Sequence, residues 1–148
     1  MVLLFLGKLL SLQQEEADVF IAKYNINGLL QWVRSAGGTS SDYGEGITID
    51  SSGNVYVTGS YQGTATFGNT TFTSVGLRDI FIVKYNGSGL FQWVRSARGL
   101  GDDFGMGIVV NGSSNVYVTG SYEGTTTFGN TILTTVGLRD VFVVRLDN

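Results

Sequence analysis

The chain has no cysteine, no histidine and no proline among its 148 residues. The absence of cysteine excludes disulfides, thiolate nucleophiles and most zinc or iron–sulfur sites. The absence of histidine excludes a Ser-His-Asp triad, a facial iron triad and an imidazole-based pH switch. Because proline is missing, the turns must be built from Gly, Asn and Asp, which tolerate positive φ.

Basic charge is also scarce, since the formal net charge is −3 and the pI is about 4.7. No basic field is present to neutralise phosphates, so nucleic acid is not an expected partner. The apolar stretch 1–12 lacks a basic n-region, is interrupted by Lys8 and leads to no small-residue cleavage site, so it gives no clear signal peptide. It is also too short to span a bilayer.

What the chain does contain is glycine and short apolar segments. It has 22 Gly residues and 43% hydrophobic residues. Ser, Thr and Asn are plentiful while Ala, Glu and Lys are sparse, which favours many short strands joined by turns over long helices. The composition therefore predicts an all-β domain that buries a core.

An internal repeat organises the whole sequence. An offset of 61 residues aligns Trp32 with Trp93 and Gly59 with Gly120, and about two thirds of the positions in 18–78 are identical in 79–139. We divide the single domain 1–148 into a diverged repeat segment (1–17), a first repeat (18–78), a second repeat (79–139) and the start of a third repeat (140–148).

Each repeat predicts four main strands and one inserted hairpin. Turn residues separate the strand segments, and two of the strands carry apolar residues on both faces, as in a sheet packed above and below. This pattern is typical of a four-stranded propeller blade. The segments are 107–110 and 115–122 around the turn NGSS, the hairpin 64–73 with Gly68 and Asn69 at its tip, and the strands 79–86 and 90–97.

One recurring string carries a family resemblance: DxFIxKYxxxGxxxW, then GG, Asp, GI and DxxGNVYVTGSY. It resembles the bacterial β-propeller repeats called SBBP repeats. The resemblance implies a secreted or cell-surface protein whose propellers are structural or interaction modules, with no catalytic motif and no cofactor. In the first copy the string consists of Asp18, Phe20, Lys23, Tyr24, Gly28, Trp32, Gly37, Gly38, Asp42, Ile47, Asp50, Gly53 and Asn54–Tyr61.

The chain holds about 2.4 repeats, whereas a closed propeller needs about 4–8 blades. We expect incomplete blades with unpaired strand edges at both ends, and completion by other copies of the chain. If the last blade takes its outer strand from residues 30–36 of the next chain, the contact is head to tail and gives a ring or a filament. At the offset, Leu6-Gly7-Lys8 aligns with Phe67-Gly68-Asn69, so residues 1–17 are expected in the inserted-hairpin register.

Several residues could bind a ligand. Trp32 and Trp93 could stack on sugars, but they lie within apolar strands, which favours core packing. Tyr43 and Phe104 lie in repeated Gly-rich loops and would carry the alternative function, a carbohydrate-binding propeller lectin with glycan partners. The lectin reading competes with the main prediction, a non-enzymatic scaffold that assembles with itself.

Repeated aspartates offer a second kind of candidate site. Asp42 and Asp103 could bind calcium, and Asp102 next to Asp103 adds a second carboxylate in one loop. Each loop offers few oxygen ligands, so turn capping by aspartate is the favoured interpretation. Asp18, Asp79 and Asp140 recur before the third strand, where we expect them to fix a turn.

Overall fold

The computed structural model describes residues 3–10 and 17–147, with side chains for 17–147. The described residues form twelve strands, and every pairing between two strands is antiparallel. The strands are β1 (Leu3–Leu10), β2 (Ala17–Tyr24), β3 (Leu30–Gly38), β4 (Tyr43–Ile49), β5 (Val55–Phe67), β6 (Thr70–Tyr85), β7 (Phe91–Gly99), β8 (Phe104–Val110), β9 (Val116–Tyr122), β10 (Thr125–Phe128), β11 (Thr131–Thr134) and β12 (Asp140–Leu146). The predicted all-β class is confirmed.

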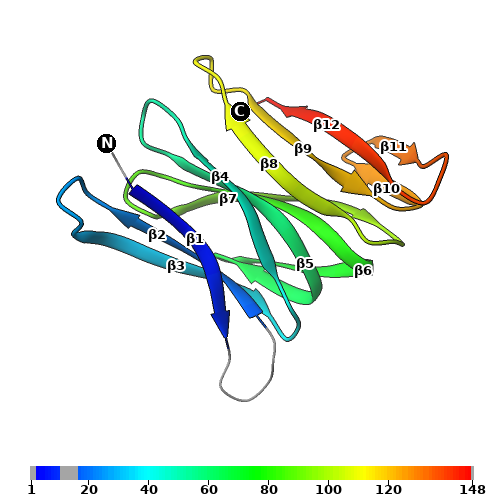
Figure 1. Ribbon diagram of the computed structural model, residues 1–148, viewed down its shortest axis with the longest axis horizontal. Helices are drawn as coiled ribbons and strands as arrows, with labels where there is room; N and C mark the ends of the chain where they lie inside the picture. The colour runs from blue at the N-terminus through cyan, green and yellow to red at the C-terminus, as the bar shows by residue number, and fades with distance from the viewer. Residues whose placement is uncertain (1–2, 11–16, 148) are drawn as a thin grey trace.

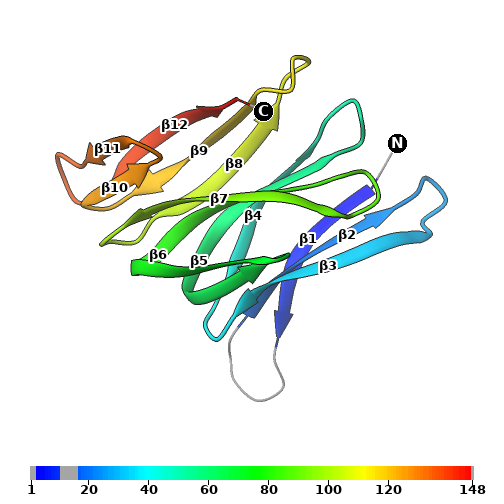
Figure 2. The same ribbon diagram turned by 180° about the vertical axis from the view of Figure 1, so that it is seen from behind.

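The strands are grouped into three units that lie side by side in chain order (Figure 1). The first unit is β1-β2-β3, the second is β4-β5-β6-β7 and the third is β8-β9-β12. Figure 2 shows the same order from behind. Among the described residues, only the second unit has all four predicted main strands.

Each inserted hairpin connects one unit to the unit before it. The far ends of β5 and β6 form the predicted hairpin, with Thr64 opposite Thr73 and Phe67 opposite Thr70. This hairpin also pairs with the end of β3, through Gly37 and Gly38. The hairpin β10–β11 pairs in the same way with the end of β7. The contacts are only two residues long, so packing between the units must supply most of the cohesion.

The core lies between the units, in two clusters. The first cluster joins Val19, Ile21 and Trp32 of the first unit to residues of the second unit such as Phe81 and Tyr85. We call the side of a unit that meets the next unit its forward face and the opposite side its backward face. The second cluster joins the forward face of the second unit to the backward face of the third, through Tyr56, Ile80, Ile82, Ala97, Val116, Val118, Tyr122 and Phe142.

The expected inserted-hairpin register of the N-terminal segment is wrong for residues 3–10. β1 is a continuous strand in which Leu3 pairs with Tyr24 and Leu9 with Asp18, as Val55 pairs with Tyr85 and Tyr61 with Asp79. β1 therefore takes the place of the second strand of a unit. Lys8 stands where the hairpin has Asn69, so the segment lacks the turn residue that follows glycine at the hairpin tip. Residues 11–16 lie outside the described residues.

Asn and Asp side chains fix the turns between the main strands. Asn25 Oδ1 accepts the backbone N–H groups of Asn27 and Leu29, at 3.0 and 2.9 Å. Asn86 Oδ1 does the same for Ser88 and Leu90. These turns carry glycine at positive φ, with Gly28 at 76° and Gly89 at 77°.

Within the described part of the chain, no helix is long and apolar enough to cross a membrane.

Mutation of Phe81 tests whether the core lies between the first and second units. It is fully buried between the first and second units, whereas its counterpart Phe20 lies on the half-buried backward face of the first unit. We expect F81A to lower the free energy of unfolding by about 3–5 kcal/mol, and F20A to cost less than half of that. Chemical denaturation followed by tryptophan fluorescence measures both values. Equal costs would show that the first and second units do not share a core.

Candidate functional site

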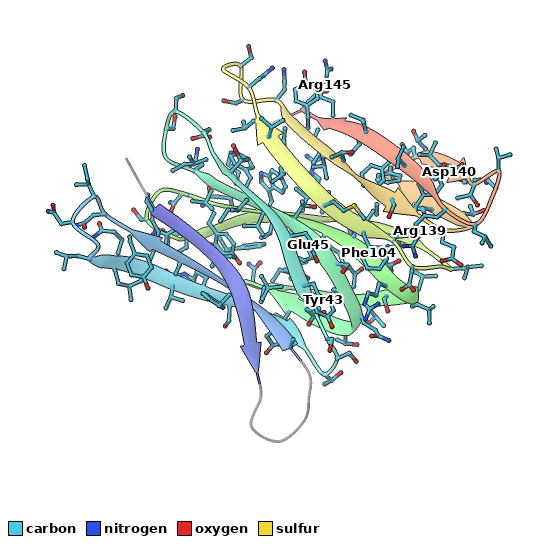
Figure 3. The ribbon with its side chains drawn as sticks, in the orientation of Figure 1. Tyr43, Glu45, Phe104, Arg139, Asp140 and Arg145 are labelled. Atoms are coloured by element: carbon cyan, nitrogen blue, oxygen red, sulfur yellow. The ribbon has the colours of Figure 1, made fainter. Side chains whose placement is uncertain are left out.

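The structure brings Tyr43 and Phe104 together around an arginine. The guanidinium carbon of Arg78 lies 5.3 Å from the Tyr43 ring centre and 5.8 Å from the Phe104 ring centre. Arg139 lies 5.1 Å from the Phe104 ring centre. Figure 3 shows Tyr43 on the second unit and Phe104 and Arg139 on the third. These contacts have no local signature in the sequence, because Arg78 lies 35 positions after Tyr43.

This arrangement uses the aromatic rings to join units. A cation over a ring face is attracted by the quadrupole of the ring, and Arg78 makes this contact to the second and third units at once. Stacking on a sugar requires a ring face that the sugar can reach, and Arg78 already lies against both rings. Glycan binding through Tyr43 and Phe104 stays a prediction.

Aspartate carboxylates tie the strand ends to neighbouring segments. Asp79 accepts the backbone N–H of Gly99 at 2.9 Å and that of Val75 at 2.8 Å. Asp140 similarly accepts the backbone N–H of Val136, at 3.1 Å. For Asp140, whose bond spans the bend at 136–138, the expectation that it fixes a turn is therefore confirmed. Asp79 makes the same bond inside strand β6, where the structure has no turn. Burial raises the pKa of Asp79, although the two backbone N–H groups act in the opposite direction.

Asp103 makes a comparable set of contacts in the third unit. Its carboxylate accepts the Glu123 backbone N–H at 3.1 Å and the Thr126 hydroxyl at 2.7 Å, and its own N–H donates to Arg78 O at 3.0 Å. In the preceding unit, Asp42 accepts the Gln62 N–H at 3.1 Å. Burial is the main reason that the pKa of Asp103 is raised, and the nearby charge of Asp79 adds to it.

The Asp102 and Asp103 pair does not have the form of a metal centre. Asp102 faces the guanidinium of Arg78, with an N–O distance of 3.7 Å, while both Asp103 oxygens accept protein donors. Among the residues with described side chains, no three Asp or Glu side chains converge on a common point that could hold a cation. Calcium typically takes six to eight oxygen ligands, which this loop does not assemble.

Trp32 packs in the core and anchors a turn of the next unit. It is 8% exposed, lies 6.3 Å from Tyr85 between ring centres, and donates from Nε1 to Gly87 O at 3.2 Å. Lys23 Nζ donates to the same oxygen at 2.8 Å, and Arg34 Nε donates to Gly89 O at 2.7 Å. These three side chains hold the turn between β6 and β7 against the first unit, so core packing is confirmed for Trp32.

The equivalent side chains of the second unit are Lys84, Trp93 and Arg95. Trp93 is half-buried and lies edge-on to Tyr56, with ring centres 6.2 Å apart. Lys84 Nζ lies 5.1 Å from the Tyr56 ring centre, and Arg95 lies 5.4 Å from the Trp93 ring centre. The second unit thus carries the same three side-chain types on the side that faces the third unit. A turn between the third and fourth strands of that unit would lie against them.

An apolar groove of about 600 Å³ lies beside β12. In the second unit, the same register is filled by β7, whose Phe91 contacts Tyr85 with ring centres 6.2 Å apart and whose Val94 packs on the first core cluster. Within the described residues, no strand pairs with the outer edge of β12. The groove walls include Ile82, Ala97, Phe128, Leu133, Phe142, Val144 and Leu146.

The forward face of the third unit is also open. Val141 and Val143 are 82% and 77% exposed, whereas their counterparts Ile80 and Ile82 are 0% and 2% exposed. The counterparts in the first unit, Val19 and Ile21, are fully buried as well. These positions lie against the next unit wherever a next unit is present. The groove and this face together form the strongest candidate for a binding surface, which we call the β12 surface.

Comparison with known proteins agrees with the repeat. Residues 31–60 match the family model described as Beta-propeller repeat (SBBP), which confirms the predicted resemblance over this segment. A curated relative is an uncharacterized WD repeat-containing protein of Acanthamoeba polyphaga mimivirus, 30% identical over 127 residues. The match covers 76% of this chain and 9% of that protein, so this chain spans a small part of its length.

Replacing aspartates by asparagine tests their roles as acceptors. Asp79 accepts two backbone N–H groups, and an asparagine NH₂ would oppose one of them, so we expect D79N to lower the free energy of unfolding by about 1–3 kcal/mol. D103N should cost under about 1 kcal/mol, because the Thr126 hydroxyl can accept from the new amide. Urea unfolding at pH 7 compares the two variants, and a larger loss for D103N would contradict this assignment.

The pH dependence of stability follows from the raised pKa of both groups. Each carboxyl binds its proton more tightly in the folded chain than at its ordinary pKa of 3.8. The free energy of unfolding should therefore fall as pH rises from about 3.8 through the raised pKa values and then level off. D103N should flatten this fall. A profile between pH 3 and 8 that is unchanged in D103N would show that Asp103 does not contribute.

Proposed function

We propose that the chain is a non-enzymatic interaction scaffold of propeller repeats, which assembles with further copies of itself head to tail. The proposal is based mainly on the exposure of Val141 and Val143 on the forward face of the third unit. The equivalent forward faces of the first and second units each pack against the unit that follows. The repeat match and the WD-repeat relative support a scaffold built from repeats.

The opposite end of the molecule supplies a candidate partner face. On β3, Leu30 and Val33 are exposed at the positions where β7 has Phe91 and Val94. The two ends differ, so a contact between them is heterologous and either closes into a ring or continues as a filament. Three or four chains that each contribute two complete blades would give six or eight blades, within the usual range for propellers.

The energy of such a contact comes from several apolar side chains together. Burying one valine stabilises by about 1.5–3 kcal/mol, whereas association costs at least about 4 kcal/mol in lost translational and rotational freedom. Val141 and Val143 alone would give a weak contact. Leu30, Val33 and the groove beside β12 extend the buried area, which supports a stable assembly.

The chemistry of the chain supports a non-catalytic role. It has no histidine and no cysteine, and the buried carboxylates of Asp79 and Asp103 accept hydrogen bonds that organise loops. We place the assembly outside the cell or at its surface, on the resemblance to SBBP repeats.

Charge on the forward face tests the proposed assembly. We expect the wild-type chain to form rings or filaments at micromolar concentration, and V141D/V143D to remain a monomer, because two carboxylates would have to be buried at the contact. Both side chains already face solvent in the single chain, so the melting temperature of the diluted monomer should fall only by what the lower strand propensity of Asp costs. Light scattering and negative-stain microscopy measure the mass and shape of the particles.

V136D is the matched control, because Val136 is 99% exposed and lies outside strand β12. It introduces a carboxylate at another exposed valine and should assemble as the wild type does. A wild-type chain that stays monomeric at high micromolar concentration would contradict the proposal. Unchanged assembly of V141D/V143D would show that copies meet through another surface.

A further inference from the structure

We propose that copies of the chain join by strand exchange, in which β3 of one copy fills the groove beside β12 of another. In the single chain, the β1–β2 pair occupies the place that β9 and β12 of the other copy would take. This pair is therefore a removable cap that limits assembly. The inference rests on the proposed function and specifies how its contact is made and restrained.

The groove has the shape of a missing fourth strand, and the chain itself shows how it is filled. In the second unit β7 pairs with β6, placing Phe91 opposite Tyr85 and Val94 opposite Val83. The counterparts of Tyr85 and Val83 in the third unit are Leu146 and Val144, which line the groove. An incoming fourth strand would pair with β12 in this register and bring two apolar side chains into the groove.

β3 offers the side chains that such a strand needs. It carries Leu30 and Val33 at the positions of Phe91 and Val94, and these are 53% and 48% exposed in the single chain. β7 cannot serve as the donor, because its Phe91 and Ala97 already pack into the two core clusters. Donation of β3 would bury Leu30 and Val33, which is the gain that favours exchange.

In the exchanged form, the turn that precedes β3 would also find hydrogen-bond donors. Lys23, Trp32 and Arg34 hold the carbonyl oxygens of Gly87 and Gly89 in the second unit. Lys84, Trp93 and Arg95 have the same register, and the carbonyls that correspond to Gly87 and Gly89 are those of Ile26 and Gly28. The incoming turn would thus meet cations and an indole N–H at the positions where the chain already uses them.

The β1–β2 pair matches β9–β12 strand for strand. β1 pairs Leu3 with Tyr24 and Leu9 with Asp18, and β9 pairs Val116 with Leu146 and Tyr122 with Asp140. Val19 and Ile21 of β2 cover the second unit, and the exposed Val141 and Val143 of β12 have the same register. The second unit can therefore be covered by its own β2 or by β12 of another copy.

Exchange would replace the pairing of β3 with β2 by an equivalent pairing with β12, and it would add further contacts. β3 would leave β2 for β12, keeping the same pairing register, and would meet Val144 where β2 has Ala22. Trp32 would stay packed on the second unit of its own chain, since β3 moves together with that unit. The composite blade also gains β8, an inner strand that the first unit lacks among the described residues. Displacement of β1 and β2, which gives up the pairing of β2 with β3 and the core contacts of Val19 and Ile21, is the cost of the exchange.

Engineered disulfides test the exchange in the 148-residue chain, which has no cysteine of its own. Val33 pairs with Ala22 in β2, so a disulfide in A22C/V33C would lock β3 to the cap. We expect the oxidised variant to lose the assembled species and the reduced variant to assemble as the wild type does. V83C/V94C has the same register inside the second unit and shows whether this pairing accepts a disulfide.

A second experiment looks for the new pairing directly. Chains carrying V33C are mixed with chains carrying V144C, incubated at assembly concentration and then oxidised. Exchange predicts a disulfide-linked dimer of one chain of each kind, and mixing V33C with V136C should give none. Full assembly of oxidised A22C/V33C, or no link between positions 33 and 144 in assembled chains, would overturn the exchange and leave self-assembly intact. If wild-type and reduced chains both stay monomeric, the proposed function fails and the exchange fails with it.

Discussion

The burial of one sheet face against the next is the interaction on which the structure depends. Each unit has two apolar faces, and a single layer of strands cannot remove both from water. The two core clusters lie at the two contacts between units, and the pairing of hairpins with neighbouring strands involves only a few residues. The end faces of the stack then face solvent, which explains the exposure of Val141 and Val143 at one end and of Leu30 and Val33 at the other.

Polar groups set the spacing between units. Lys23, Trp32 and Arg34 hold a turn of the second unit, while Arg78 joins Tyr43 to Phe104 across the second and third units. Buried carboxylates such as Asp79 accept backbone N–H groups that would otherwise be unsatisfied. Docking of a further unit can reuse these contacts because the same residue types recur in register. The proposed assembly would therefore use the same kind of contact between copies as between units of one chain.

Much of the fold could be predicted from the sequence, because a strand, a turn and a repeat each have a local signature. The hairpin at 64–73 and the turn-fixing role of Asp140 followed from such signatures. The pairing of β1 could not be predicted in this way. A glycine aligned with Gly68 indicated a hairpin, although the asparagine that follows Gly68 is missing, and the pairing of β1 depends on the free edge of β2. The Arg78 contacts and the groove beside β12 arise from three-dimensional packing between units.

Hydrogen–deuterium exchange at increasing protein concentration would show whether another copy completes the third unit, because amide protection reports pairing strand by strand. We expect amides of β12 to gain protection as concentration rises, while those of β1 lose it as the cap is displaced. Amides of β5 and β6, which are paired in both forms, serve as the internal reference. Protection of β12 and β1 that does not change with concentration would contradict the claim that the open third unit is completed by another copy.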